Sequence, residues 1–150
     1  MYQRILVAIE HSSADRTILT HVEELARLMG SDLLLVHVAD GFAARHFDDL
    51  NLRESEEMKD DRAYLQQICD ELTGRGLSCT TLLAFGDPAK ELIRVAEEQR
   101  VDLIAMSTHG HRFIADLLHG TTVDRVRHLV SIPVLLLRVP PLSQGKDSHM

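Results

Sequence analysis

Tryptophan is missing from this 150-residue sequence, and phenylalanine and tyrosine bring the aromatic share to only 4%. Proteins that bind single-stranded nucleic acids stack the bases on aromatic side chains, so residues for that purpose are scarce here. The net charge of −7 also excludes a broad basic surface for a phosphate backbone. We therefore expect no nucleic acid among the partners of this protein.

Long hydrophobic runs and disulfide patterns are equally scarce. The best apolar run, at 132–137, is far shorter than the roughly 18 residues that span a bilayer. The N-terminus enters an apolar segment at Ile5 without the layout of a signal peptide. Cys69 and Cys79 form neither a CxxC pair nor a disulfide framework, which favours buried thiols over redox chemistry. We expect no membrane partner and a cytoplasmic location.

Short apolar runs alternate with segments of helical periodicity along most of the chain. Gly30 is placed to end the first helix, and Ser12 or Ser13 to cap its start. Alternation of strands and helices predicts an α/β fold: a five-stranded, doubly wound parallel sheet with helices on both faces, in one domain over residues 1–139. Pro133 favours an edge position for the last strand. The predicted strands are residues 5–9, 33–38, 79–84, 101–106 and 132–139.

The remaining segments have simpler interpretations. The stretch from Asp40 to Arg53 is polar and irregular and is predicted to be a loop. The charged run at 53–62 is interpreted as the solvated start of a long helix. Gly86-Asp87-Pro88 supplies a turn, an N-cap and a proline at the first helical position. Residues 140–150 are predicted to be a polar, disordered tail.

Phosphate chemistry is indicated between Met106 and Thr122. This segment leaves a buried strand, passes Gly110 and reaches a predicted helix start at Gly120-Thr121-Thr122. Free backbone N–H groups at a helix start suit phosphate, and glycine lets the backbone approach an anion closely. The hydroxyls of Thr121 and Thr122 add donors, while Arg112 can pair with phosphate oxygens. The alternative is a plain turn at Gly120 with Thr121 as an ordinary N-cap.

Nine histidines suggest a second chemistry. His109, His111 and His119 fall in the same segment, where imidazoles could bind zinc or another transition metal. Their spacing matches no closed structural site, so histidines exposed or hydrogen-bonded in a polar loop are the favoured interpretation. His37, inside a predicted strand, is expected to be a core histidine with its polar atoms satisfied.

The spacing of Gly110, nine further residues and Gly120-Thr121 resembles the nucleotide loop of the universal stress protein family, G-x2-G-x9-G-[S/T]. The apolar strands at 5–9 and 35–38, Gly86-Asp87-Pro88 and the segment at 131–137 extend the resemblance over residues 1–139. It implies a five-stranded parallel domain of the adenine-nucleotide alpha-hydrolase-like type. It also implies a cytoplasmic homodimer paired through the last strand, and in many members binding of ATP with a divalent metal, Mg or Mn.

Carried over by position, the resemblance assigns the residues around a nucleotide in three groups. Ser107 stands where the motif has its first glycine, Glu10 where an aspartate is usual, and Phe113 where binders often carry glycine. These departures motivate an alternative, a nucleotide-free dimeric interaction module of the same family. The implied contacts are Ala8, Glu10 and Val38 around adenine, Met106 and Ser107 along the ribose, and Gly110, Gly120, Thr121 and Thr122 at the phosphates.

Catalysis has little support in the sequence. There is no GxxxxGK[ST] loop, which excludes a P-loop ATPase. Glu10-His11-Ser12-Ser13 replaces the HxGH signature of the related nucleotidyl-transferring enzymes. We therefore expect a regulatory nucleotide-binding protein in the stress response and no enzyme, with at most slow, incidental ATP hydrolysis.

Overall fold

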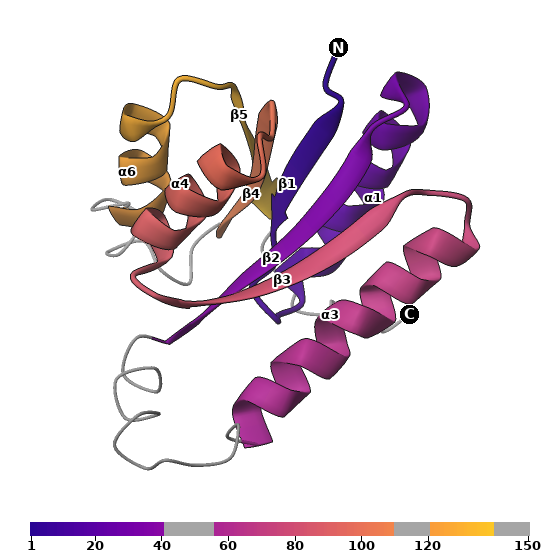
Figure 1. Ribbon diagram of the computed structural model, residues 1–150, viewed down its shortest axis with the longest axis horizontal. Helices are drawn as coiled ribbons and strands as arrows, with labels where there is room; N and C mark the ends of the chain where they lie inside the picture. The colour runs from indigo at the N-terminus through magenta and orange to yellow at the C-terminus, as the bar shows by residue number, and fades with distance from the viewer. Residues whose placement is uncertain (41–55, 110–120, 140–150) are drawn as a thin grey trace, which may run out of the picture.

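The computed structural model describes residues 1–40, 56–109 and 121–139. Its centre is a five-stranded parallel sheet with the strand order β3-β2-β1-β4-β5 (Figure 1). The predicted parallel α/β fold is confirmed, and no strand end differs from the predicted one by more than three residues. The strands are β1 (Arg4–Ala8), β2 (Asp32–Asp40), β3 (Cys79–Gly86), β4 (Leu103–His109) and β5 (Val134–Val139).

Helices cover both faces of the sheet, as the doubly wound prediction requires. One pair packs on each face, and Figure 1 shows α4 beside α6 on one side of the sheet and α1 and α3 on the other. None of the helices in the described residues is long and apolar enough to cross a membrane. The helices are α1 (Ala14–Met29), α3 (Glu56–Gly74), α4 (Pro88–Glu98) and α6 (Thr121–Leu129).

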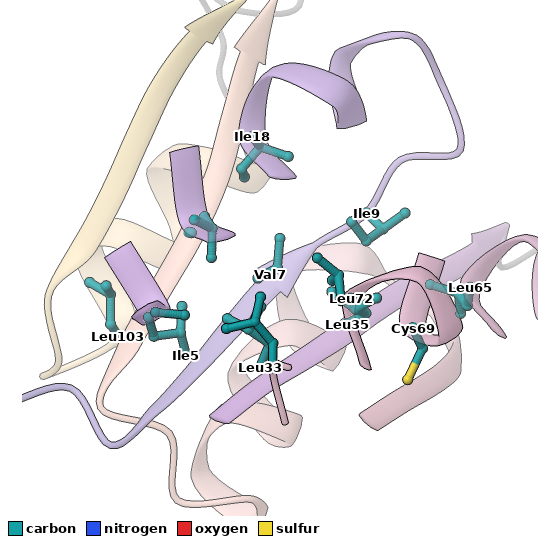
Figure 2. Close-up of a cluster of buried hydrophobic side chains, with 14 residues drawn as sticks. Ile5, Val7, Ile9, Ile18, Leu33, Leu35, Leu65, Cys69, Leu72 and Leu103 are labelled. Carbon is teal, nitrogen blue, oxygen red and sulfur yellow. The ribbon is translucent and has the colours of Figure 1, made fainter. Parts of the chain in front are cut away.

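The alternation of side chains along β1 divides the core into two layers. Ile5 and Val7 point to the α1–α3 face, and Leu6 points to the α4–α6 face, all with no exposed surface. A strand buried on both faces reads as a continuous apolar run, which is why 5–9 was recognisable. Figure 2 shows the first layer, where Ile18 of α1 and Leu65 of α3 meet the strand residues.

Helix ends follow the predicted local chemistry with one difference. Gly30 ends α1 at φ 68°, and the Asp87 carboxylate accepts a hydrogen bond from the Lys90 N–H at 2.9 Å at the start of α4. At the start of α1, Ser13 makes no side-chain capping bond, whereas the Ser12 hydroxyl accepts a hydrogen bond from the Ala14 N–H at 3.2 Å, so Ser12 is the one of the two expected serines that caps. The difference is the buried Asp15 carboxylate, which accepts the backbone N–H groups of Glu10 at 2.9 Å and Ser12 at 3.1 Å and so fixes the turn that follows β1.

The sheet edges lie at β3 and β5. Pro133 immediately precedes β5, and its carbonyl accepts a hydrogen bond from the Ile104 N–H at 3.1 Å. The predicted edge position of the last strand is therefore confirmed. Of the predicted irregular stretch, Asp40 is the last residue of β2 and 41–53 lie outside the described residues, as does the predicted tail at 140–150.

Candidate functional site

The strand order reverses at β1, because β2 and β3 lie on one side of it and β4 and β5 on the other. Ligands of open parallel sheets bind beyond the carboxyl ends of the strands near such a reversal. A cleft of about 600 Å³ opens there, next to the ends of β1, β2 and β3. Its lining residues are Glu10, His11, His37, Val38, Glu57, Asp60, Asp61, Gly86 and Pro88.

This cleft is lined by two of the residues that the family resemblance assigns to the adenine base. Glu10 follows β1, and Val38 lies near the end of β2. Ala8 packs with the core layer under α4 and α6. Met106 belongs to the same layer and is only 4% exposed, so its side chain is a core side chain in this structure.

Ser107 lies near the end of β4, two residues before its last residue. Its side chain is buried, and its Oγ has no hydrogen-bond partner within the described residues. A buried hydroxyl without a partner costs free energy, so such groups in native proteins call for an explanation. The position next to the strand-order reversal gives one, since a polar ligand group would satisfy the hydroxyl.

The predicted phosphate loop is described only at its end. Thr121 is the first residue of α6, and Thr122 is half-buried. Gly110, Arg112 and Gly120 lie outside the described residues, as do His111 and His119, two of the three histidines considered for the less favoured metal site. His109, the third member, is the last residue of β4. Within the described ranges, no group of three or more His, Cys, Asp or Glu side chains is arranged to hold a metal ion.

A histidine–aspartate cluster forms one wall of the cleft. Asp61 of α3 is buried, and its Oδ1 lies 2.6 Å from Nδ1 of His11, which follows β1. Its Oδ2 lies 3.5 Å from Nε2 of His37 on β2. Nδ1 of His37 donates a hydrogen bond to the Ile9 carbonyl oxygen at 2.7 Å, as expected, but the prediction of a core position is wrong, because His37 is only partly buried and lines the cleft. One carboxylate thus joins α3 to the ends of two strands.

Tyr64 extends this cluster toward α1. Its ring stacks on His11, with centroids 4.0 Å apart and planes 19° from parallel. Its hydroxyl donates a hydrogen bond to the buried Asp15 carboxylate at 2.7 Å. Burial and the hydrogen bond to Asp15 raise the pKa of Tyr64. The turn after β1 is therefore held from α1 through Asp15 and from α3 through Asp61 and Tyr64.

The sequence interpretation of 53–62 as a solvated face is wrong for Asp61. A signal for its burial was present, because Asp61 lies three residues after Met58 and four before Leu65, both buried. That spacing places the carboxylate on the core-facing stripe of α3. The many charged residues at 53–62 led to the interpretation of the whole run as solvated, so the burial of Asp61 was not predicted.

Acidic side chains dominate the polar lining. Glu57 and Asp60 are exposed at the rim, and no Lys or Arg is among the lining residues that the structure describes. The basic side chains of α6 have partners elsewhere: Arg125 bonds Asp87 at 3.1 Å and Arg127 bonds Asp124 at 3.1 Å. The Lys90 N–H and then the Arg125 guanidinium lower the pKa of Asp87.

Comparison with known proteins decides the family. The model of the universal stress protein family matches residues 1–138, nearly the whole chain. The chain belongs to the universal stress protein family. Universal stress protein MJ0577 from Methanocaldococcus jannaschii is 24% identical over 155 residues, an alignment covering 92% of this chain and 96% of that protein.

Solved structures agree with this universal stress protein in fold. A structure of MJ0577 has a TM-score of 0.80 at 25% identity and covers 94% of this chain and 99% of its own. A universal stress protein in complex with cAMP has a TM-score of 0.67 at 19% identity, with coverage of 91% and 97%. The Archaeoglobus fulgidus protein in complex with dAMP has a TM-score of 0.66 at 19% identity, with coverage of 90% and 97%.

Proposed function

We propose that this universal stress protein binds an adenine nucleotide in the cleft beside β1 and acts as a regulatory protein in the stress response, not as an enzyme. The observation that carries the proposal is the cleft itself. It lies at the strand-order reversal and is lined by Glu10 and Val38, two of the residues assigned to the nucleotide by sequence. The cAMP and dAMP complexes of proteins with this fold support an adenine nucleotide as the ligand.

In this proposal the phosphates of the nucleotide lie near the start of α6. The first backbone N–H groups of a helix are unpaired and attract anions, and α6 begins at Thr121 beyond the end of β4. The unpartnered Ser107 hydroxyl lies on the same strand end. The acidic lining on the other side of β1 repels phosphate, which also favours placing the nucleoside half in the cleft.

We propose ATP with Mg²⁺ or Mn²⁺ as the physiological form. Mg²⁺ typically binds through substrate phosphates and one or two carboxylates, which suits a site whose described residues hold no complete metal cluster. The cation supplies charge neutralisation between the triphosphate and the acidic wall.

Isothermal titration calorimetry tests the binding proposal. ATP and AMP are titrated into the protein with and without MgCl2, and we expect saturable binding, with ATP depending on the metal more strongly than AMP. Glu10→Ala should weaken binding, whereas Glu98→Ala, at the far end of α4, should not. Absence of heat for both nucleotides at millimolar concentration, with and without metal, would refute the proposal.

We also propose a homodimer that forms through β5. This strand lies at a sheet edge, has the sequence VLLLRV and leaves Leu136 37% exposed. An apolar edge strand is a template for pairing with another chain, and pairing two copies about a two-fold axis removes it from water. In such a dimer, bound nucleotide would act by changing the contacts between the two subunits.

Sedimentation velocity tests the dimer. Leu136→Lys should convert the dimer to a monomer, while Thr80→Lys, an exposed position on the opposite edge strand β3, should leave it intact. A dimer unaffected by Leu136→Lys would place the interface elsewhere.

A second candidate function is a nucleotide-free interaction module. The acidic lining favours it, because four carboxylates and no described Lys or Arg oppose a triphosphate. Its signature is a protein that remains dimeric in sedimentation yet shows no heat with any adenine nucleotide.

A further inference from the structure

His11 is held in one orientation by three independent constraints. Its Nδ1 lies 2.6 Å from Oδ1 of the buried Asp61, and its ring stacks on Tyr64 at 4.0 Å. Its backbone has φ 62°, which non-glycine residues rarely adopt. Backbone strain of this kind persists only where the surroundings determine it, and it concentrates at functional sites. An imidazole fixed in this way at the edge of a cleft is positioned for a contact.

The bond to Asp61 determines which ring nitrogen of His11 carries the proton. A carboxylate oxygen accepts hydrogen bonds, so Nδ1 is the protonated nitrogen in the neutral ring and Nε2 presents a lone pair. No residue in the described part of the chain is recorded in a hydrogen bond with Nε2, and the side chain retains 36% of its exposure. The neutral ring therefore offers one free hydrogen-bond acceptor.

The rest of the cleft lining also offers hydrogen-bond acceptors. Among the described residues, those of the lining that carry charge are carboxylates: Glu10, Glu57, Asp60 and Asp61. This lining favours ligand groups that donate hydrogen bonds and carry no negative charge. Sugar hydroxyls and the exocyclic amino group of adenine are such groups, and phosphate is not.

We propose that His11 is a ligand-binding residue, whose Nε2 accepts a hydrogen bond from a hydroxyl or amino group of the nucleoside half of the ligand, and that Asp61 is its positioning residue. The inference rests on the proposed function, because it concerns how the same cleft recognises its nucleotide. It adds a recognition contact outside the residues that the family motif assigns. Specificity follows, since a site with a preset acceptor discriminates against ligands that lack the matching donor.

A double-mutant cycle between protein and ligand tests the contact. The protein variants are His11→Phe, which keeps a ring against Tyr64 but has no nitrogen, and the control Tyr2→Phe, an aromatic substitution outside the cleft. The probes are AMP, 2′-deoxy-AMP, 3′-deoxy-AMP and the monophosphate of purine riboside, which lacks the amino group. Calorimetry measures the dissociation constants of the three proteins, wild type included, for the four probes at about pH 8.

We expect wild type to bind one of the three analogues about tenfold more weakly than AMP, as loss of one hydrogen bond predicts. His11→Phe should bind AMP about tenfold more weakly and treat that analogue like AMP, while Tyr2→Phe should keep the wild-type discrimination. Unchanged AMP binding by His11→Phe overturns the inference. So does a uniform loss in which every analogue is weakened by the same factor in both proteins, because that is the result of a purely structural role.

A measurement on wild type alone covers the case in which His11→Phe fails to fold. Two-bond ¹H–¹⁵N NMR spectra distinguish the histidine tautomers, and we expect His11 in the Nδ1–H form, with the Nε2 resonance shifting when AMP is added. The Nε2–H form, or an Nε2 resonance that does not move at saturating AMP, overturns the inference and leaves nucleotide binding itself established. Wild type that binds neither AMP nor ATP refutes the proposed function, and this inference with it.

Discussion

The Tyr64 hydroxyl of α3 donates a 2.7 Å hydrogen bond to the Asp15 carboxylate of α1, joining the two helices on one face of the sheet. Asp15 is 1% exposed and accepts two backbone N–H groups from the turn after β1 as well. A buried carboxylate needs such partners, because leaving any of its charge unpaired is costly. The shape of the turn that carries Glu10 and His11 therefore depends on contacts from both helices.

Tyr64→Phe should lower the free energy of unfolding by about 1–3 kcal/mol at neutral pH, because Asp15 loses one buried donor. Urea denaturation followed by circular dichroism measures this. Tyr2→Phe serves as the control, because the Tyr2 hydroxyl is in none of the hydrogen bonds recorded among the described residues. Equal stability of Tyr64→Phe and wild type would show that water or another donor replaces the hydroxyl.

The same pair predicts a loss of stability at high pH. Burial and the Asp15 hydrogen bond raise the pKa of Tyr64 in the folded protein, so the hydroxyl's contribution is complete below the unfolded pKa of about 10 and is lost as pH rises through the folded pKa. As the pH rises above about 10, wild type should lose more stability than Tyr64→Phe. Parallel curves for the two proteins in urea denaturation would contradict this assignment.

Gly30 and Gly74 offer a matched pair of glycine substitutions. Gly30 has φ 68°, whereas Gly74, the last residue of α3, has no positive φ, and a Cβ would meet nothing within 4 Å at either position. Gly30→Ala should lower the free energy of unfolding by about 1–2 kcal/mol through backbone strain alone. Gly74→Ala should raise the free energy of unfolding by about 0.4–1 kcal/mol, because alanine lowers the conformational entropy of the unfolded chain. Thermal and urea denaturation should show opposite signs, and a common sign would refute the argument.

Cys79 should react slowly with alkylating reagents. Burial raises the pKa of its thiol, and the adjacent Cys69 raises it further, so little of the reactive thiolate forms near neutral pH. Cys69 is itself buried and donates its thiol hydrogen to the Cys79 carbonyl at 3.1 Å. Mass spectrometry after brief iodoacetamide treatment at about pH 8 should find little label in native protein and two labels in urea. Rapid labelling of native Cys79 would contradict the burial.

Glu23 should contribute to stability in a pH-dependent way. The Arg75 guanidinium bonds it at 2.7 Å and, with a smaller effect from Arg27, lowers the pKa of the carboxyl. The contribution is present above the unfolded pKa of about 4.3 and is lost as pH falls through the folded pKa. Glu23→Gln should cost about 0.2–1 kcal/mol at neutral pH and nothing at about pH 2. A cost that persists at low pH would point to packing instead of charge.

The sequence predicted the fold better than the site, for identifiable reasons. β1 and β2 are continuous apolar runs, and Gly30 and Asp87 mark helix ends through local chemistry that needs no knowledge of distant residues. The Asp61–His11 contact joins residues 50 positions apart, and no local pattern encodes that pairing. Its one visible trace was the position of Asp61 on the apolar stripe of α3, which the surrounding charges obscured.

The pairing of β1 has a consequence for synthesis of the chain. Ile5 pairs with Leu33 on one side and with Leu103 on the other. A ribosome that has not yet reached Leu103 therefore holds β1, the central strand of the finished sheet, as a bare and strongly apolar edge. Premature termination in that interval would release a fragment prone to aggregate. For this protein the vulnerable period of translation ends when β4 emerges, well after the residues around Glu10 and Val38 have been made.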